Sequence, residues 1–108
     1  LVLTIAGHIG DGNFHIIPLM DLKDAATRKI IPELSRKVYD LVLHYGGSIT
    51  AEHNDGLIRG PYVQQMFGAH AYELFQQIKR IFDPKGIFNP GRKIDVDWKW
   101  ALEHLRTD

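Results

Sequence analysis

Residues 7–15, with the sequence Gly-His-Ile-Gly-Asp-Gly-Asn-Phe-His, constrain the fold of this chain more than any other stretch. Apolar, alternating segments flank it on both sides, at residues 1–6 and 14–20. Two such runs joined by Asp-Gly predict a β-hairpin, because a type I′ turn needs positive φ at both central residues. The sequence therefore predicts two antiparallel strands with Asp11 and Gly12 at the centre of a two-residue turn.

This turn would place side chains that can bind a metal on one face of the hairpin. In the expected register His8 lies opposite His15 and Gly10 lies opposite Asn13, with opposed Cβ atoms roughly 5 Å apart. Side chains alternate between the two faces of a strand, so all four residues share one face. The spacing predicts two imidazoles side by side with an amide next to them, which is half of a metal site. The alternative is that both histidines are only polar residues on the solvent-facing side.

The composition favours one compact domain and argues against several classes of protein. The chain has 108 residues, of which 44% are hydrophobic, and its 13 basic and 13 acidic side chains give no net charge. This balance argues against charge-driven binding to nucleic acid or to a membrane surface. The absence of cysteine excludes disulfides, thiol nucleophiles and cysteine metal clusters. No apolar run approaches the roughly 20 residues of a membrane span, and no signal peptide is visible, so a cytoplasmic location is the default expectation.

The first half of the chain continues with a helix and a short strand. Apolar residues at three- and four-residue steps predict a helix over about residues 24–45, which Pro32 either starts or kinks. Gly46 and Gly47 then supply a left-handed stop. Residues 48–51 are predicted to form a short strand.

The second half is predicted to be helical. Pro61 opens a helical region that Gly68 interrupts, and a stronger amphipathic helix follows over about residues 70–82. Asp95 or Asp97 would cap a last helix. The order of elements predicts an α+β fold, in which an antiparallel sheet carries helices packed on one face and is followed by C-terminal helices.

The polar pair Glu52-His53 is the best candidate to complete a metal site. Neighbours on a strand point in opposite directions, so one residue would ligate a metal and the other would do something else, unless the backbone bends. Glu52 as a ligand leaves His53 as a base, since the charge of histidine changes near neutral pH. The alternative is an ordinary solvated loop.

Three segments together resemble the C-terminal part of the FAD-linked oxidases, the D-lactate, glycolate and D-2-hydroxyglutarate dehydrogenases. The segments are residues 7–15, 46–53 and 78–92. The resemblance implies that residues 1–93 are the C-terminal domain of such an enzyme, a ferredoxin-like half of the substrate cap. Residues 94–108 would be a linker or helix toward a following region. The resemblance further implies that the family's FAD lies mainly in a separate N-terminal domain, so we expect this chain to be a piece of a longer protein without that domain.

The resemblance also implies roles for single residues. His8 and His15 match the family's two metal-binding histidines, and Glu52 matches its carboxylate ligand. His53 matches the histidine proposed to take the hydroxyl proton of the substrate. Asn89, in the sequence Asn-Pro-Gly, matches a residue near the flavin.

One departure from the family pattern points to a subgroup. The family usually has Glu-His-Gly where this chain has Asn54 as the third residue. The run at residues 54–59 looks more like the subgroup whose flavin part is fused to an iron–sulfur part. Beside the metal ligands, Asn13 is the residue expected to bind substrate.

The sequence thus predicts the substrate- and metal-binding part of an FAD-dependent dehydrogenase that oxidises a D-2-hydroxy acid to the 2-oxo acid. The metal would be divalent, with zinc favoured, and the fragment alone would be inactive. Expected partners are the small-molecule substrate, the FAD domain of the same chain and an iron–sulfur domain, but neither nucleic acid nor a membrane. Two alternatives remain: a non-catalytic interaction domain, and a metal-dependent hydrolase that activates water with Glu52 or His53.

Overall fold

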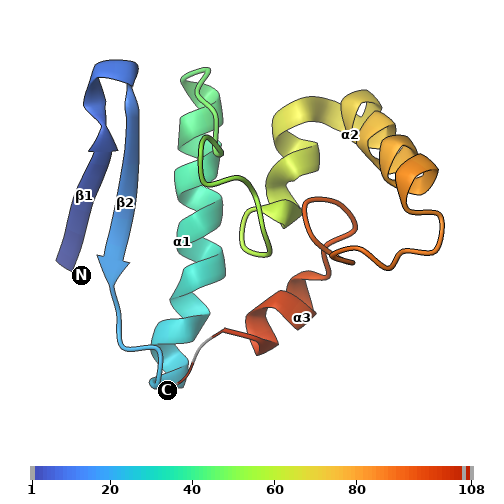
Figure 1. Cartoon of the computed structure of the whole chain (residues 1–108). Coiled ribbons are helices and arrows are strands. Elements are labelled where there is room, and N and C mark those ends of the chain that lie inside the picture. The colour runs from blue at the N-terminus through green and yellow to red at the C-terminus, as the bar shows by residue number, and fades with distance from the viewer. Residues whose placement is uncertain (1, 106, 108) are drawn as a thin grey trace. The chain divides into compact units, whose positions relative to one another are not determined.

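The structure is a computed structural model, which describes residues 2–105 and 107. Its described elements follow one another along the chain as a strand, a 3₁₀ turn, a second strand, a long helix, a second 3₁₀ turn and two further helices. Figure 1 shows the strands and helices. They are β1 (Val2–His8), η1 (Ile9–Asp11), β2 (Asn13–Leu19), α1 (Ala25–His44), η2 (Gly60–Tyr62), α2 (Val63–Phe82) and α3 (Trp98–Glu103). One antiparallel strand pair with helices confirms the α+β class.

The described chain divides into two compact units. Residues up to Asp40 belong to the first unit, and Leu41–Leu105 form the second. Residue 1 of the expected first strand, and residues 106 and 108 of the expected linker or helix, lie outside the described residues. Among the described residues, none of the helices combines the length and the apolar character that crossing a bilayer requires.

The first unit begins with the predicted hairpin, but its turn differs from the expected one. Residues 9–12 form the connection, in which the N–H of Gly12 donates to the carbonyl of Ile9 at 3.0 Å. Gly12 alone adopts the left-handed region, with φ of 66°. The prediction of a two-residue turn was therefore wrong. In a type I′ turn Asp11 would need a positive φ, whereas in the observed 3₁₀ turn it does not.

Helix α1 confirms the sequence prediction to within a residue at each end. The Asp24 carboxylate accepts hydrogen bonds from the backbone N–H of Ala26 and the hydroxyl of Thr27, each at 2.9 Å. These bonds lower the pKa of the Asp24 carboxyl below its ordinary value. Pro32 lies inside the helix, which begins seven residues before it and runs on to His44.

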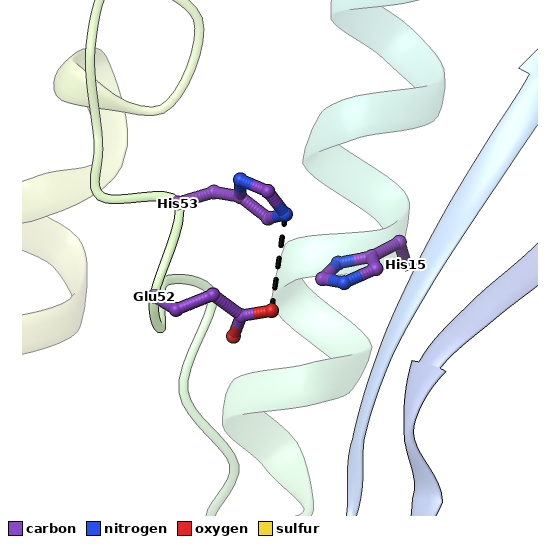
Figure 2. A group of neighbouring side chains, drawn as sticks. All are labelled: His15, Glu52 and His53. Carbon is purple, nitrogen blue, oxygen red and sulfur yellow. Dashed lines mark ion pairs between the residues drawn. The ribbon is translucent and has the colours of Figure 1, made fainter.

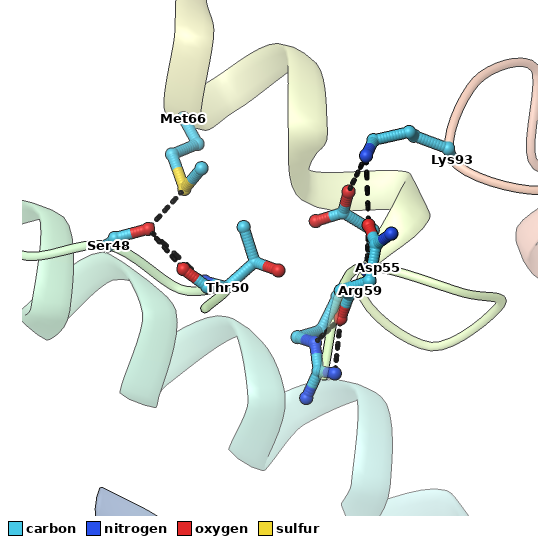
Figure 3. A network of polar contacts seen from close by, with 7 residues as sticks. Ser48, Thr50, Asp55, Arg59, Met66 and Lys93 are labelled. Atoms are coloured by element: carbon cyan, nitrogen blue, oxygen red, sulfur yellow. Dashed lines mark hydrogen bonds and ion pairs between the residues drawn. The ribbon is translucent and has the colours of Figure 1, made fainter. Parts of the chain in front are cut away.

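The predicted strand at residues 48–51 is absent from the described chain. The Ser48 hydroxyl donates to the carbonyl of Thr50 at 2.6 Å and accepts from the N–H of Thr50 at 3.3 Å. The N–H of Ile49 donates to the sulfur of Met66 at 3.3 Å. The same sulfur lies 3.4 Å from the hydroxyl of Ser48 (Figure 3). A side chain thus satisfies the polar backbone groups that a neighbouring strand would otherwise bind.

Helix α2 bends at Gly68 and ends at Phe82, as the sequence predicted, and α3 begins after one of the two predicted aspartate caps. Gly68 interrupts α2 with φ of 80° and ψ of 164°, a conformation that is essentially confined to glycine. Asp97, rather than Asp95, caps α3 and accepts from the N–H groups of Lys99 and Trp100 at 2.9 and 3.2 Å.

The core of the second unit is small. Its buried hydrophobic residues are Ile49, Val63, Ile94 and Ala101. Gly60 packs so closely against Val96 that an added Cβ would lie 2.3 Å from the Cγ2 atom of Val96. This close approach holds Gly60 against the segment that contains Lys93 and Val96.

Candidate functional site

The hairpin gathers three of the predicted site residues on one face. His8 pairs with Asn13, and Ala6 pairs with His15, so the observed register is displaced by two residues from the predicted one. A displacement by two keeps every side chain on its face, whereas a displacement by one would reverse them all. His8, Asn13 and His15 therefore share a face, although the two histidines are diagonal neighbours and not directly opposite.

The two hairpin histidines lie close to each other. Their ring centroids are 6.5 Å apart and their planes are nearly perpendicular, with an angle of 85°. A ring nitrogen binds zinc at about 2.0–2.1 Å. Rotation of the side chains could therefore direct one nitrogen from each ring toward a shared cation.

Glu52 and His53 lie in a bend of the second unit and not on a strand. The N–H of Asn54 donates to the carbonyl of Ala51 at 3.1 Å, which closes a turn around the pair. Within this turn the two side chains point the same way, and Oε1 of Glu52 lies 3.8 Å from Nε2 of His53 (Figure 2). The side chains are 40% and 64% exposed, respectively, so both are accessible to a ligand.

The residue that follows this pair adopts an unusual backbone conformation. Asn54 has φ of 60°, which few residues other than glycine adopt. The guanidinium of Arg59 donates from Nε and Nη2 to the backbone carbonyl of Asn54. The Oδ1 atom of Asn54 also accepts from the N–H of Asp55 at 2.8 Å. The turn that carries Glu52 and His53 is thus fixed immediately after them.

Asn89 lies in a segment that the end of α2 holds in place. The Asp83 carboxylate accepts from the N–H groups of Ile87 and Phe88, each at 2.9 Å. The Lys79 ammonium donates to the same carboxylate and to the backbone carbonyl of Phe88. The hydrogen bond from Lys79, followed by the two backbone bonds, lowers the pKa of the Asp83 carboxyl to about 2.

Sequence reasoning missed Asp83 and Lys79, because Asp-Pro-Lys-Gly is typical of an ordinary turn. The available signal was the pair of a lysine and an aspartate four residues apart at the end of a helix.

The second unit also contains a hollow that the sequence did not predict. Its volume is about 660 Å³, and Glu52 contributes to its lining. Its apolar lining comes largely from α2, through Phe67, Phe75, Ile78 and Phe82. A periodic sequence pattern could not predict this hollow, because its lining comes from separate parts of the sequence. Residues from the loop after α1 and from the segment near residue 93 complete the lining.

Comparison with known proteins decides the family. Residues 1–93 match the family described as FAD linked oxidases, C-terminal domain. The chain belongs to this family. The description of this family links the domain to an FAD cofactor.

Individual relatives of this domain are oxidases and dehydrogenases. It is 29% identical over 91 residues to the glycolate oxidase subunit GlcD of Bacillus subtilis, which covers 84% of this chain and 19% of the relative. It is 37% identical over 92 residues to the D-2-hydroxyglutarate dehydrogenase of Pseudomonas putida, covering 85% of this chain and 9% of the relative. It is 36% identical over 92 residues to the D-lactate dehydrogenase of Archaeoglobus fulgidus, and this match covers 85% of this chain and 20% of the relative.

The domain thus spans about a fifth or less of the length of these relatives. No solved structure matches it significantly.

Proposed function

We propose that this domain supplies metal ligands and a general base to an FAD-dependent dehydrogenase that oxidises a D-2-hydroxy acid to the 2-oxo acid. The observation that carries the proposal is the pair of histidines on one hairpin face, with ring centroids 6.5 Å apart. The names of the relatives support the substrate class, since they act on glycolate, D-lactate and D-2-hydroxyglutarate.

His8, His15 and Glu52 are the residues proposed to hold a divalent cation. Two imidazole nitrogens and one carboxylate oxygen are a donor set that suits zinc and leaves coordination positions for a substrate. Manganese and ferrous iron accept the same donors. When bound, the metal would act as a Lewis acid that favours loss of the proton from the substrate's hydroxyl group.

His53 is proposed to take the hydroxyl proton at one ring nitrogen. Its exposed side chain lies next to Glu52, so a substrate bound at Glu52 would be within its reach. Oxidation also removes a hydride from C2, and FAD supplies the acceptor for it when bound. Asn13, on the face of the two histidines, would orient the substrate through its amide, and Asn89 would lie near the flavin.

The length of one relative supports a further domain in the full-length protein. The match covers 9% of the D-2-hydroxyglutarate dehydrogenase of Pseudomonas putida but 19% of the glycolate oxidase subunit, so the former is about twice as long. Together with the Glu-His-Asn sequence at residues 52–54, this favours an iron–sulfur part in the same polypeptide as the proposed electron acceptor.

The proposal is tested by metal analysis of the full-length enzyme. His8→Ala and Glu52→Ala should each reduce the bound metal per flavin by more than about tenfold and abolish turnover, because removal of one ligand opens the site. His53→Asn should keep the metal but lose turnover, since it removes only the base.

His70→Ala, which changes an exposed histidine of α2, is the matched control and should retain both properties. Full metal content in the His8→Ala enzyme would overturn the proposed ligand set.

A further inference from the structure

Lys93 connects two segments of the second unit that are far apart in the sequence. Its ammonium lies 2.9 Å from Oδ1 of Asn54. It also lies 3.4 Å from Oδ2 of Asp55 (Figure 3). Its backbone N–H donates to the carbonyl of Gly56 at 3.5 Å. One residue therefore binds the turn that directly follows His53 through both its side chain and its backbone.

The two connected segments hold unusual backbone conformations. Asn54 has φ of 60° and Lys93 has φ of 70°. In the described chain, the other non-glycine residues with positive φ are Asn89 and Asp95, at 45° and 53°. Such conformations persist only where the surroundings hold them, and they cluster at functional sites. Asn54 lies in the turn that Lys93 binds, and Asn89 and Asp95 lie within four residues of Lys93 in the chain.

Burial makes the contact with Asp55 difficult to replace. The side chain of Asp55 is 2% exposed, whereas that of Lys93 is 52% exposed. The other oxygen of Asp55, Oδ1, is buried and has no hydrogen-bond partner among the described residues. A buried carboxylate is costly without a compensating charge, so the lysine ammonium is needed where it lies.

We propose that Lys93 is a positioning residue for the proposed dehydrogenase site. By holding Asn54 in its left-handed conformation and neutralising Asp55, it fixes the turn that presents Glu52 to the metal and His53 to the substrate. This inference rests on the function proposed above. It adds Lys93 as a residue that does not touch the reacting atoms and that acts by orienting Glu52 and His53.

The test uses the full-length enzyme and the double variant Lys93→Met/Asp55→Asn. The single change Lys93→Met would leave a buried charge without a partner and could prevent folding, whereas the double variant leaves no buried charge unpaired. With an unchanged melting temperature, we expect metal affinity to fall about tenfold or more, as for other groups that orient ligands. We also expect kcat to fall more than KM, and the pH profile of kcat/KM to shift.

A third substitution separates positioning from general stability. Glycine adopts positive φ without strain, so adding Asn54→Gly to the double variant should restore part of the metal affinity and kcat. The matched control is Lys99→Met, which removes an 86% exposed lysine paired with Glu103 and should change none of these properties.

Wild-type metal affinity and an unchanged pH profile in the folded double variant would overturn the inference. If the Glu52→Ala enzyme still loses its metal in the same assay, the proposed function stands without the inference about Lys93. If Glu52→Ala keeps its metal, the ligand set fails, and the pH profile alone still decides whether Lys93 positions His53.

Discussion

Gly7 occupies a position that no residue with a side chain could take without changing the hairpin. Its φ is 134°, and a Cβ atom there would lie 2.6 Å from the carbonyl oxygen of Asn13 and 2.7 Å from the Cα of Phe14. Both are backbone atoms of β2, so neither can move aside unless the strands separate. The glycine before His8 therefore allows the strands to approach closely enough for His8 to pair with Asn13.

Gly7→Ala should destabilise the hairpin by about 1–3 kcal/mol, because it combines an unfavourable φ with a backbone collision. Hydrogen exchange of residues 2–19 in the full-length enzyme measures this as faster opening. Gly10→Ala is the control, since a Cβ there meets nothing within 4 Å. Equal exchange rates in the two variants would show that close approach at Gly7 does not matter.

At the scale of elements, the end of α2 determines how Asn89 is presented. Asp83 follows the last residue of the helix and binds the N–H groups of Ile87 and Phe88, while Lys79 on the last turn binds its carboxylate. Ile87 and Phe88 themselves are 64% and 67% exposed, so apolar burial contributes little to their order. The ionised form of Asp83 therefore holds this segment in place.

The order of this segment should depend on pH in the acid range. The pKa of Asp83 is about 2 in the folded state, against 3.8 ordinarily, so between these values the unfolded state binds more protons. The stabilisation is fully present above about pH 4 and is lost as the pH falls through about 2. Hydrogen exchange of residues 84–91, corrected for the intrinsic rate, should accelerate across this range.

Asp83→Asn should remove this pH dependence, whereas Glu73→Gln, an exposed change on α2, should preserve it. A segment that exchanges equally at pH 5 and pH 2 in the native sequence would contradict the role of Asp83.

The elements that could be predicted from the sequence are those with local causes. The 3.6-residue spacing of apolar side chains gave α1, and Gly68 marked the bend in α2. The strand at residues 48–51 could not be judged locally, because a strand needs a partner, and the hydroxyl of Ser48 binds this backbone instead. The hairpin face was predictable, since it survives a shift of two residues, but the choice between a type I′ and a 3₁₀ turn was not.

At the scale of the whole molecule, the proposed ligands come from two separate parts of the sequence. His8 and His15 belong to the first unit, and Glu52 belongs to the second. The resemblance to the family predicts all three ligands, whereas the proposed positioning contact of Lys93 with Asp55 has no signature in the sequence, because its two residues match no repeating spacing. A cation bound by all three ligands would stabilise the folded state, since the unfolded chain offers no such site.

Metal removal from the full-length enzyme should therefore reduce both turnover and stability. A chelator is expected to abolish oxidation of the hydroxy acid while the flavin stays bound, and added zinc should restore it. A metal at 100 times its Kd contributes about 2.7 kcal/mol to the folded state, so the melting temperature should fall on chelation. The melting temperature of the His8→Ala enzyme should not respond to the chelator, since its site is already broken. If the chelator lowers both melting temperatures equally, the stabilising metal is bound elsewhere, and if it leaves native turnover intact, the hairpin histidines have another role.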